Sequence, residues 1–110
     1  MSDDALSFGR RIAKRRKELG FSLKEVADRI KKGDGKPISP QYLNDIEHDR
    51  RQPDSEHLIE QLAISLKIPL EVLYYEAGKL GDSIRNPKAS EDQIVNAYKA
   101  FRRTLRAPGK

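Results

Sequence analysis

Two side-chain amides, those of Gln41 and Asn44, stand three positions apart in the segment 38–53. A side-chain amide carries both donors and an acceptor, so each can form a paired hydrogen bond with the edge of an adenine base. Arg50 and Arg51 follow closely, and guanidinium groups bind phosphate oxygens through several donors. These residue types favour recognition of a nucleic acid over catalysis.

The segment that carries these residues has the pattern of one short helix. Ser39 is a good N-cap, because its hydroxyl can accept from a free backbone N–H of the first turn. Pro40 follows at the first helical position, where its missing N–H costs nothing. At helical periodicity, the side expected to pack holds Tyr42, Leu43, Ile46 and Glu47. The opposite side, which is mostly polar, holds Pro40, Gln41, Asn44, Asp45 and His48.

The preceding chain predicts two helices joined to this one. Residues 5–19 repeat Phe8, Ile12 and Leu19 at helical spacing, which predicts a first helix. A capping box, Ser22 with Glu25, starts a second helix. The buried set of this second helix is expected to be Leu23, Val26, Ala27 and Ile30. A basic loop punctuated by glycine and proline then leads into the helix described above, so the pattern is a helix-turn-helix with an enlarged turn.

Arg16 differs from the other basic residues of the first helix because it lies on the apolar stripe, four positions after Ile12. A buried positive charge without a partner is very costly, so Arg16 needs one. The remaining cations form either a solvated face or a set of DNA contacts. They are Arg10, Arg11, Lys14 and Lys17.

Two further helices are expected to act as scaffold. Asp54 or Ser55 caps the fourth, and the fifth lies between Pro69 and Gly78. The fourth carries the stripe Leu58, Ile59, Leu62, Ala63 and Leu66, and the fifth turns Leu70, Leu73 and Ala77 inward. Their acidic residues, expected on a surface that faces away from phosphates, are Glu56, Glu60, Glu71 and Glu76.

Residues 79–89 have the composition of a linker, and a second capping box, Ser90 with Gln93, starts an amphipathic helix over 90–106. The apolar residues of this helix in register are Ile94, Val95, Tyr98, Phe101 and Leu105. Such a face needs a cover. It either folds back on its own domain, pairs with a second copy, or binds another protein partner.

Composition narrows the class of protein. The 110 residues suit one domain with an extension, and the absence of Cys excludes disulfides and thiolate metal sites. Residues 1–38 hold 11 Lys and Arg against 6 Asp and Glu, residues 39–78 hold 3 against 8, and residues 79–110 hold 8 against 3. This segregation indicates a nucleic-acid-facing side. No metal site, cofactor, membrane span or signal peptide is expected, and the location expected is the cytoplasm.

From Phe8 to Gly78 the chain resembles the lambda-repressor-like, Cro-type (XRE) helix-turn-helix family. The elements that carry the resemblance are Leu19-Gly20-Phe21-Ser22, Glu25-Val26-Ala27, Ile38-Ser39 with Tyr42-Leu43, Ile46-Glu47, Arg50, Pro53, Leu62-Ala63, Leu66, Ile68 and Leu73. The resemblance implies an all-α, five-helix DNA-binding domain over 5–78 that binds double-stranded operator DNA, usually as a homodimer. It also implies a structural ion pair between Arg16 and Glu47.

Given this motif, base contacts are expected from Gln41 and Asn44, and from Asp45 if it accepts from a cytosine amino group. Asp45 could equally bind a cation of its own chain. Contacts to the DNA backbone are expected from Ser22, Lys24, Lys36, Ser39, Tyr42, His48, Arg50 and Arg51.

Three features depart from the family pattern. The turn is about six residues longer, which leaves docking intact with a lysine beside a phosphate, or shifts the recognition helix. Pro40 occupies a position that commonly reads bases, and it offers no donor. Leu23 stands where a polar phosphate-contacting residue is common.

The favoured function is a sequence-specific DNA-binding transcriptional regulator, most simply a repressor, of prophage, restriction–modification or antitoxin type. A protein-interaction module that has kept the fold is the alternative. An enzyme is not expected, because the sequence offers no nucleophile triad, no paired acids and no glycine-rich phosphate loop.

Overall fold

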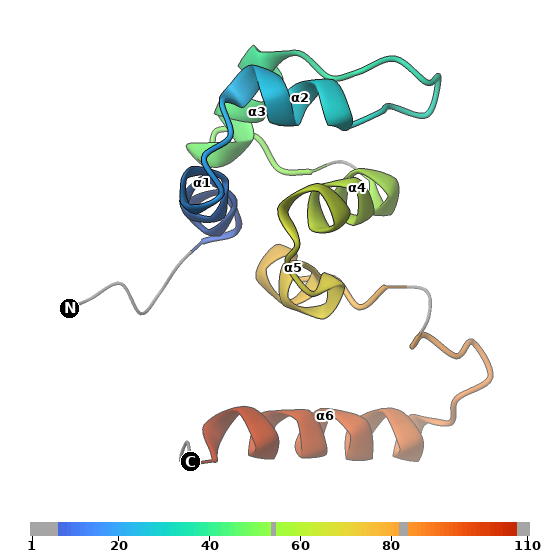
Figure 1. Ribbon diagram of the computed structural model, residues 1–110. Coiled ribbons are helices and arrows are strands. Elements are labelled where there is room, and N and C mark those ends of the chain that lie inside the picture. The colour runs from blue at the N-terminus through green and yellow to red at the C-terminus, as the bar shows by residue number, and fades with distance from the viewer. Residues whose placement is uncertain (1–6, 54, 82–83, 108–110) are drawn as a thin grey trace.

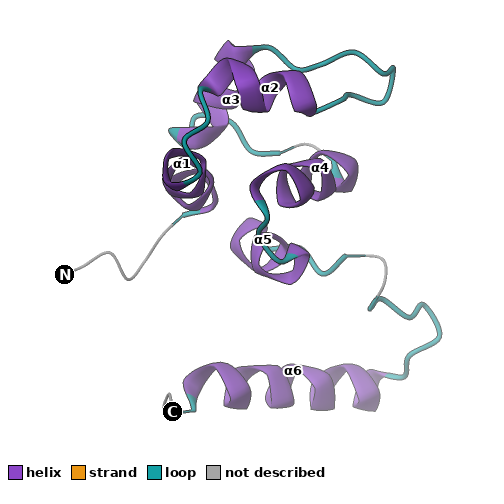
Figure 2. Ribbon diagram, in the orientation of Figure 1, coloured by secondary structure: helices purple, strands orange, loops and turns teal. Residues whose placement is uncertain are grey.

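The structure is a computed structural model that describes residues 7–53, 55–81 and 84–107. In this part of the chain the regular secondary structure is helical, apart from one isolated β-bridge. The helices are α1 (Phe8–Glu18), α2 (Leu23–Arg29), α3 (Pro40–Glu47), α4 (Glu56–Leu66), α5 (Leu70–Ala77) and α6 (Glu91–Arg106). Figures 1 and 2 show α1 to α5 gathered together and α6 lying beyond α5. The predicted all-α fold, five helices with an additional C-terminal helix, is confirmed.

One core joins the first five helices. Its buried members are Phe8, Ile12, Val26, Ala27, Ile30, Ile38, Leu43, Ile46, Leu58, Ile59, Leu62, Ala63, Leu66, Ile68, Leu73 and Tyr74. The whole predicted stripe of α4 is buried, as expected from its period. Leu19, Leu23, Leu70 and Ala77 only pack partly against this core, and Tyr74 takes a buried place that the helical pattern of α5 did not predict.

Helix α1 begins later than predicted because Ser7 is its N-cap. Ser7 has extended backbone angles, and its hydroxyl accepts from the N–H of Arg10 at 3.1 Å. The carboxylate of Asp49, just beyond α3, completes the cap by accepting from the Ser7 hydroxyl at 2.6 Å and from the Gly9 N–H at 3.2 Å. Ala5 and the other residues before Ser7 lie outside the described part of the chain, as does Asp54.

Part of the basic run on α1 holds the scaffold together. The Arg11 guanidinium pairs with Glu76 of α5 at 2.7 Å, and Arg15 donates to the carbonyl oxygens of Leu66 and Lys67 at 3.0 and 2.8 Å. These contacts fix α1 against the junction of α4 and α5. Sequence reasoning assigned Arg11 to a solvated face or to DNA, and its ion pair with Glu76 shows instead that it packs within the protein.

Two of the acidic residues of α4 lie beside the hydroxyl of the buried Tyr74. Its hydroxyl lies 3.4 Å from carboxylate oxygens of both Glu56 and Glu60. Burial, followed by the nearby carboxylates, raises the pKa of Tyr74 to about 12. Gly81 lies close against the Tyr74 ring with a φ of 83°, so the chain leaves α5 over this side chain.

Helix α6 leaves its apolar stripe uncovered. Ile94, Val95, Tyr98, Phe101 and Leu105 are each about half-exposed, at 47–59%. The ring of Phe101 meets that of Tyr75 on α5 edge to face, with centroids 6.1 Å apart. Among the described residues, none of the helices is both long enough and apolar enough to cross a membrane.

The close approach of α1 to the end of α3 generates a prediction about Gly9. A Cβ at Gly9 would overlap the carbonyl oxygen of Ile46 and stand 2.8 Å from that of Glu47. Gly9→Ala should therefore lower the free energy of unfolding by roughly 1–3 kcal/mol, measured by chemical denaturation. Gly33→Ala is the matched control, because nothing lies within 4 Å of a Cβ there. An equal effect of the two substitutions would contradict this account.

Candidate nucleic-acid interface

The buried side of α3 is tied to α1 by an ion pair between Arg16 and Glu47. Arg16 Nε donates to Glu47 Oε2 at 2.6 Å and Nη2 donates to Oε1 at 2.9 Å, while Nη1 donates to the carbonyl oxygen of Phe21 at 2.9 Å. The two side chains are 11% and 2% exposed. The hydrogen bond with Glu47 raises the pKa of Arg16, against the opposing effect of burial. The pair sets the orientation of α3.

Serine caps begin both helices of the helix-turn-helix. The Ser39 hydroxyl accepts from the N–H of Tyr42 at 3.0 Å, with Pro40 next at the first helical position. Ser22 and Glu25 form the complete capping box of α2. Each serine oxygen accepts one bond here and keeps its own hydrogen, which can be donated to a phosphate oxygen.

Asp45 lies at the centre of the polar side of α3. Its Oδ1 accepts from Gln41 Nε2 at 2.9 Å, and from Arg50 Nε and Nη2 at 3.1 and 2.9 Å. Of the two expectations for Asp45, the structure contains the local one, a bond to a cation of its own chain. Because Gln41 gives one amide hydrogen to Asp45, its carbonyl oxygen and second amide hydrogen remain to meet a base.

The remaining predicted contacts lie around α3. The Arg51 guanidinium stacks over the Tyr42 ring, 4.3 Å from its centroid, and His48 Nδ1 lies 2.9 Å from the Asn44 carbonyl oxygen. The two lysines among the predicted contacts lie away from α3. Lys24 pairs with Asp28 along the exposed face of α2 at 3.0 Å, and Lys36 belongs to the long turn between α2 and α3.

This geometry is accompanied by a match to a known family. A family profile described as helix-turn-helix matches residues 12–73, more than half of the chain. The chain belongs to the helix-turn-helix family. It is thus a DNA-binding regulator of the XRE type, and the predicted lambda-repressor-like resemblance is confirmed.

A solved structure, the SinR protein/SinI protein complex, contains a chain with the same fold. That chain aligns with a TM-score of 0.51 and 24% identity, over 88% of this chain and 98% of that one. No curated protein matches the chain.

The sequence did not predict several residues of this helix-turn-helix domain that bind segments far away in the chain. Asp49 caps α1 from 40 positions away, with its backbone in the left-handed region at φ 59°. Gln61 and His57 of α4 bind the main chain of Lys31. No local pattern marks such pairs. A tight turn inside the loop was signalled, however, by the Asp34-Gly35 dipeptide.

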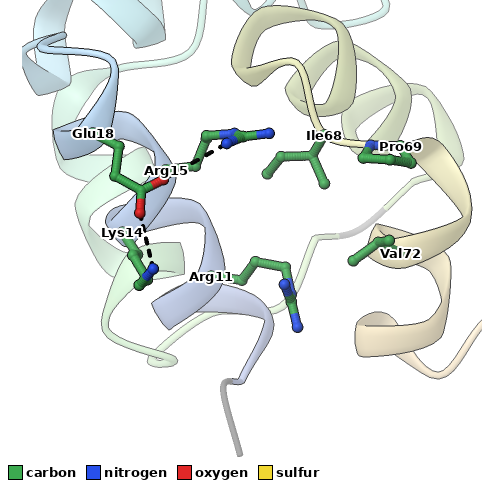
Figure 3. A pocket seen from close by; sticks show the side chains of 7 residues that line it. All are labelled: Arg11, Lys14, Arg15, Glu18, Ile68, Pro69 and Val72. Atoms are coloured by element: carbon green, nitrogen blue, oxygen red, sulfur yellow. Dashed lines mark hydrogen bonds and ion pairs between the residues drawn. The ribbon is translucent and has the colours of Figure 1, made fainter. Parts of the chain in front are cut away.

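A shallow pocket of about 210 Å³ lies on another face of the helix-turn-helix domain, between α1 and the start of α5 (Figure 3). Its charged lining residues are bound to their own neighbours, with Lys14 to Glu18 at 2.8 Å and Arg11 to Glu76. No group of three or more His, Cys, Asp or Glu side chains that could hold a metal occurs within the described ranges. The α3 surface is therefore the candidate site.

The buried pair leads to a stability prediction. Arg16→Ala and Glu47→Ala should each lower the free energy of unfolding by roughly 3–5 kcal/mol, because either leaves a charge buried without its partner. Thermal melting measures the loss, and Lys17→Ala, an exposed neighbour on α1, serves as control. Melting temperatures equal to that of the wild type for both variants would refute the structural role of the pair.

Proposed function

We propose that this protein is a sequence-specific transcriptional repressor that binds a pseudo-palindromic operator as a homodimer. The observation that carries the proposal is the division of α3 into two sides. Its buried side is locked by Arg16 and Glu47, and its outer side presents Gln41 and Asn44, which are exposed and half-buried, respectively. A helix that is fixed on its buried side and presents side-chain amides on its outer side is suited to reading the major groove.

Gln41 and Asn44 are the proposed base readers, since Pro40 has no side-chain donor. We assign Asp45 a positioning role that can coexist with a cytosine contact. Its carboxylate orients both Gln41 and Arg50, and it partly neutralises Arg50 until a phosphate competes for that guanidinium. A single acid thereby couples the base-reading surface to the backbone-binding surface.

The proposed backbone contacts come from α2 and its cap, from the long turn, and from α3 with the residues that flank it. They are Ser22, Lys24, Lys36, Ser39, Tyr42, His48, Arg50 and Arg51. The Arg51 guanidinium lies over the Tyr42 ring, so the two side chains hold each other in place at the rim of α3. Phosphate contacts of this kind fix the position of the domain and carry no sequence information.

Residues 5–78 form the proposed DNA-binding domain, 79–89 the linker and 90–106 the dimerisation helix. An antiparallel pair of α6 helices would cover both apolar stripes. It would also place Glu91 and Asp92 at the start of one helix beside the arginines near the end of the other, which are Arg102, Arg103 and Arg106. A parallel pair would bring the arginines together, which favours the antiparallel arrangement.

Stable interfaces bury about 1,200–2,000 Å² in total. Two short α6 helices alone would make a smaller interface than this. Exposed apolar residues of α5 and of the segment between α5 and α6 would extend the surface. Tyr75 already contacts Phe101, and Leu80 and Ile84 are 56% and 68% exposed. The stripe could instead hold a different protein, a role favoured by the same exposed surface. That alternative would make the chain a protein-interaction module.

The proposal predicts the outcome of in vitro selection of bound DNA. The selected sequence should be a pseudo-palindrome with half-sites about 10 base pairs apart. Gln41→Ala and Asn44→Ala should each remove about 1–3 kcal/mol of discrimination at the positions they read, with no change in salt dependence. Asn96→Ala, which removes an exposed amide on α6, is the control.

With about four to six phosphates neutralised per subunit, log K should fall by about 0.9 per neutralised phosphate for each unit of log salt concentration. Salt-insensitive binding, or selection without a consensus, would argue for the protein-interaction alternative.

The dimer generates a separate prediction. Phe101→Glu should convert the protein to monomers in sedimentation equilibrium and weaken operator binding, because a charge enters the paired stripe. Its melting temperature should stay close to that of the wild type, since Phe101 lies outside the core. Asn96→Glu adds the same charge on the polar side of α6 and should remain dimeric. If Phe101→Glu stays dimeric too, α6 is not the interface.

A further inference from the structure

The long turn between α2 and α3 is folded into a small hairpin, residues 31–37, which we call the lysine hairpin. Lys31 and Pro37 form an antiparallel bridge, and the N–H of Lys32 donates to the carbonyl oxygen of Lys36 at 2.7 Å. Gly35 closes the tip with a φ of 86° and donates to the Lys32 carbonyl oxygen at 2.8 Å. The inserted residues therefore have a defined shape.

Helix α4 holds this hairpin at its base. The N–H of Lys31 donates to Gln61 Oε1 at 3.1 Å, and the carbonyl oxygen of Lys31 lies 2.9 Å from His57 Nε2. In Figure 1 the loop that follows α2 runs outward from the helices and returns to α3. Both main-chain groups of one residue are thus bound by the same helix, which fixes the direction in which the hairpin projects.

A pocket of about 220 Å³ shows that the lysine hairpin and α3 share one surface. It is lined by Lys31, Lys32, Gly33, Ile38, Tyr42, His57 and Leu58. Tyr42 comes from the first turns of α3, and Arg51 stacks on its ring. A continuous surface therefore runs from Arg51 across Tyr42 to the base of the lysine hairpin.

We propose that the lysine hairpin as a whole is an additional arm for the phosphate backbone of DNA, in which Lys32 acts together with Lys36, already among the proposed backbone contacts, beyond the groove that α3 reads. This inference rests on the proposed function. Lys31 is not assigned a contact, because its ammonium is turned back to the end of α2, where it donates to the Asp28 carbonyl oxygen at 2.8 Å. The carboxylate of Asp34 is turned to the Lys36 N–H at 3.0 Å, within the hairpin itself.

Continuity with the Arg51–Tyr42 surface favours DNA over an acidic protein as the occupant. Two ammonium groups on a pinned turn match the closely spaced charges of a duplex backbone. Because the turn is already ordered, little conformational entropy is lost when it binds. Such an arm adds affinity for operator and random DNA alike, and it leaves the base preference to α3.

The test compares Lys32→Gln/Lys36→Gln with the wild type on the selected operator and on random DNA, over a salt series. The slope of log K against log salt should become shallower by about 0.9 for each phosphate that the variant no longer neutralises. Affinity should fall by the same factor on both DNAs, so the specificity ratio stays constant. Lys88→Gln/Lys99→Gln removes the same charge from the linker and α6, and it should leave the slope near that of the wild type.

An unchanged slope, or one equal to that of the control pair, would overturn the inference while the proposed function stands. Wild-type protein that shows no salt-dependent DNA binding would instead overturn the proposed function. A changed specificity ratio in Lys32→Gln/Lys36→Gln would also count against the arm, because phosphate contacts carry no base preference. The substituted side chains are exposed, and melting curves confirm that each variant is folded.

Discussion

The pairing of Arg16 with Glu47 is the interaction on which the geometry of the helix-turn-helix depends. A carboxylate that is 2% exposed carries a large desolvation cost, which only a well-placed cation can offset. Arg16 spreads its donors over Glu47 in α3 and the Phe21 carbonyl oxygen in the turn before α2. One guanidinium therefore joins α1, the start of α2 and the end of α3. Moving any of these would leave a buried charge without its hydrogen bonds, so the orientation of α3 is fixed before DNA is present.

The outer side of α3 differs from the buried side, because its polar groups form weak hydrogen bonds close to solvent. Asp45 holds Gln41 and Arg50 through exposed hydrogen bonds, which exchange readily with water or a ligand. In the proposed complex, the binding energy depends on the difference between these local bonds and the new ones to DNA. A buried side that resists change and an outer side that exchanges partners are both needed, since a reader must keep its position while its hydrogen bonds are replaced.

Local sequence patterns gave those parts of the fold that depend on neighbouring residues. The caps at Ser22, Ser39 and Ser90 and the stripe of α4 follow from spacing alone. The burial of Arg16 followed from its place on an apolar stripe, and its partner from the family resemblance. The Arg11–Glu76 ion pair, 65 positions apart, could not be derived in this way. A charged residue on a helix surface has the same local pattern whether it faces water, DNA or another helix, and only the tertiary fold decides between them.

The long turn between α2 and α3 is closed at its base by buried residues. Ile30 and Ile38 stand on either side of the lysine hairpin, and both are buried in the core. The N–H of Ile38 donates to the Ile30 carbonyl oxygen at 3.0 Å, which closes the insertion at its base. The chain therefore enters and leaves the turn within the core, and residues 31–37 are exposed outside it. Lengthening a loop costs little additional free energy once its ends are fixed, so the lysine hairpin can lie outside the core at small cost while Ile30 and Ile38 keep their places in it.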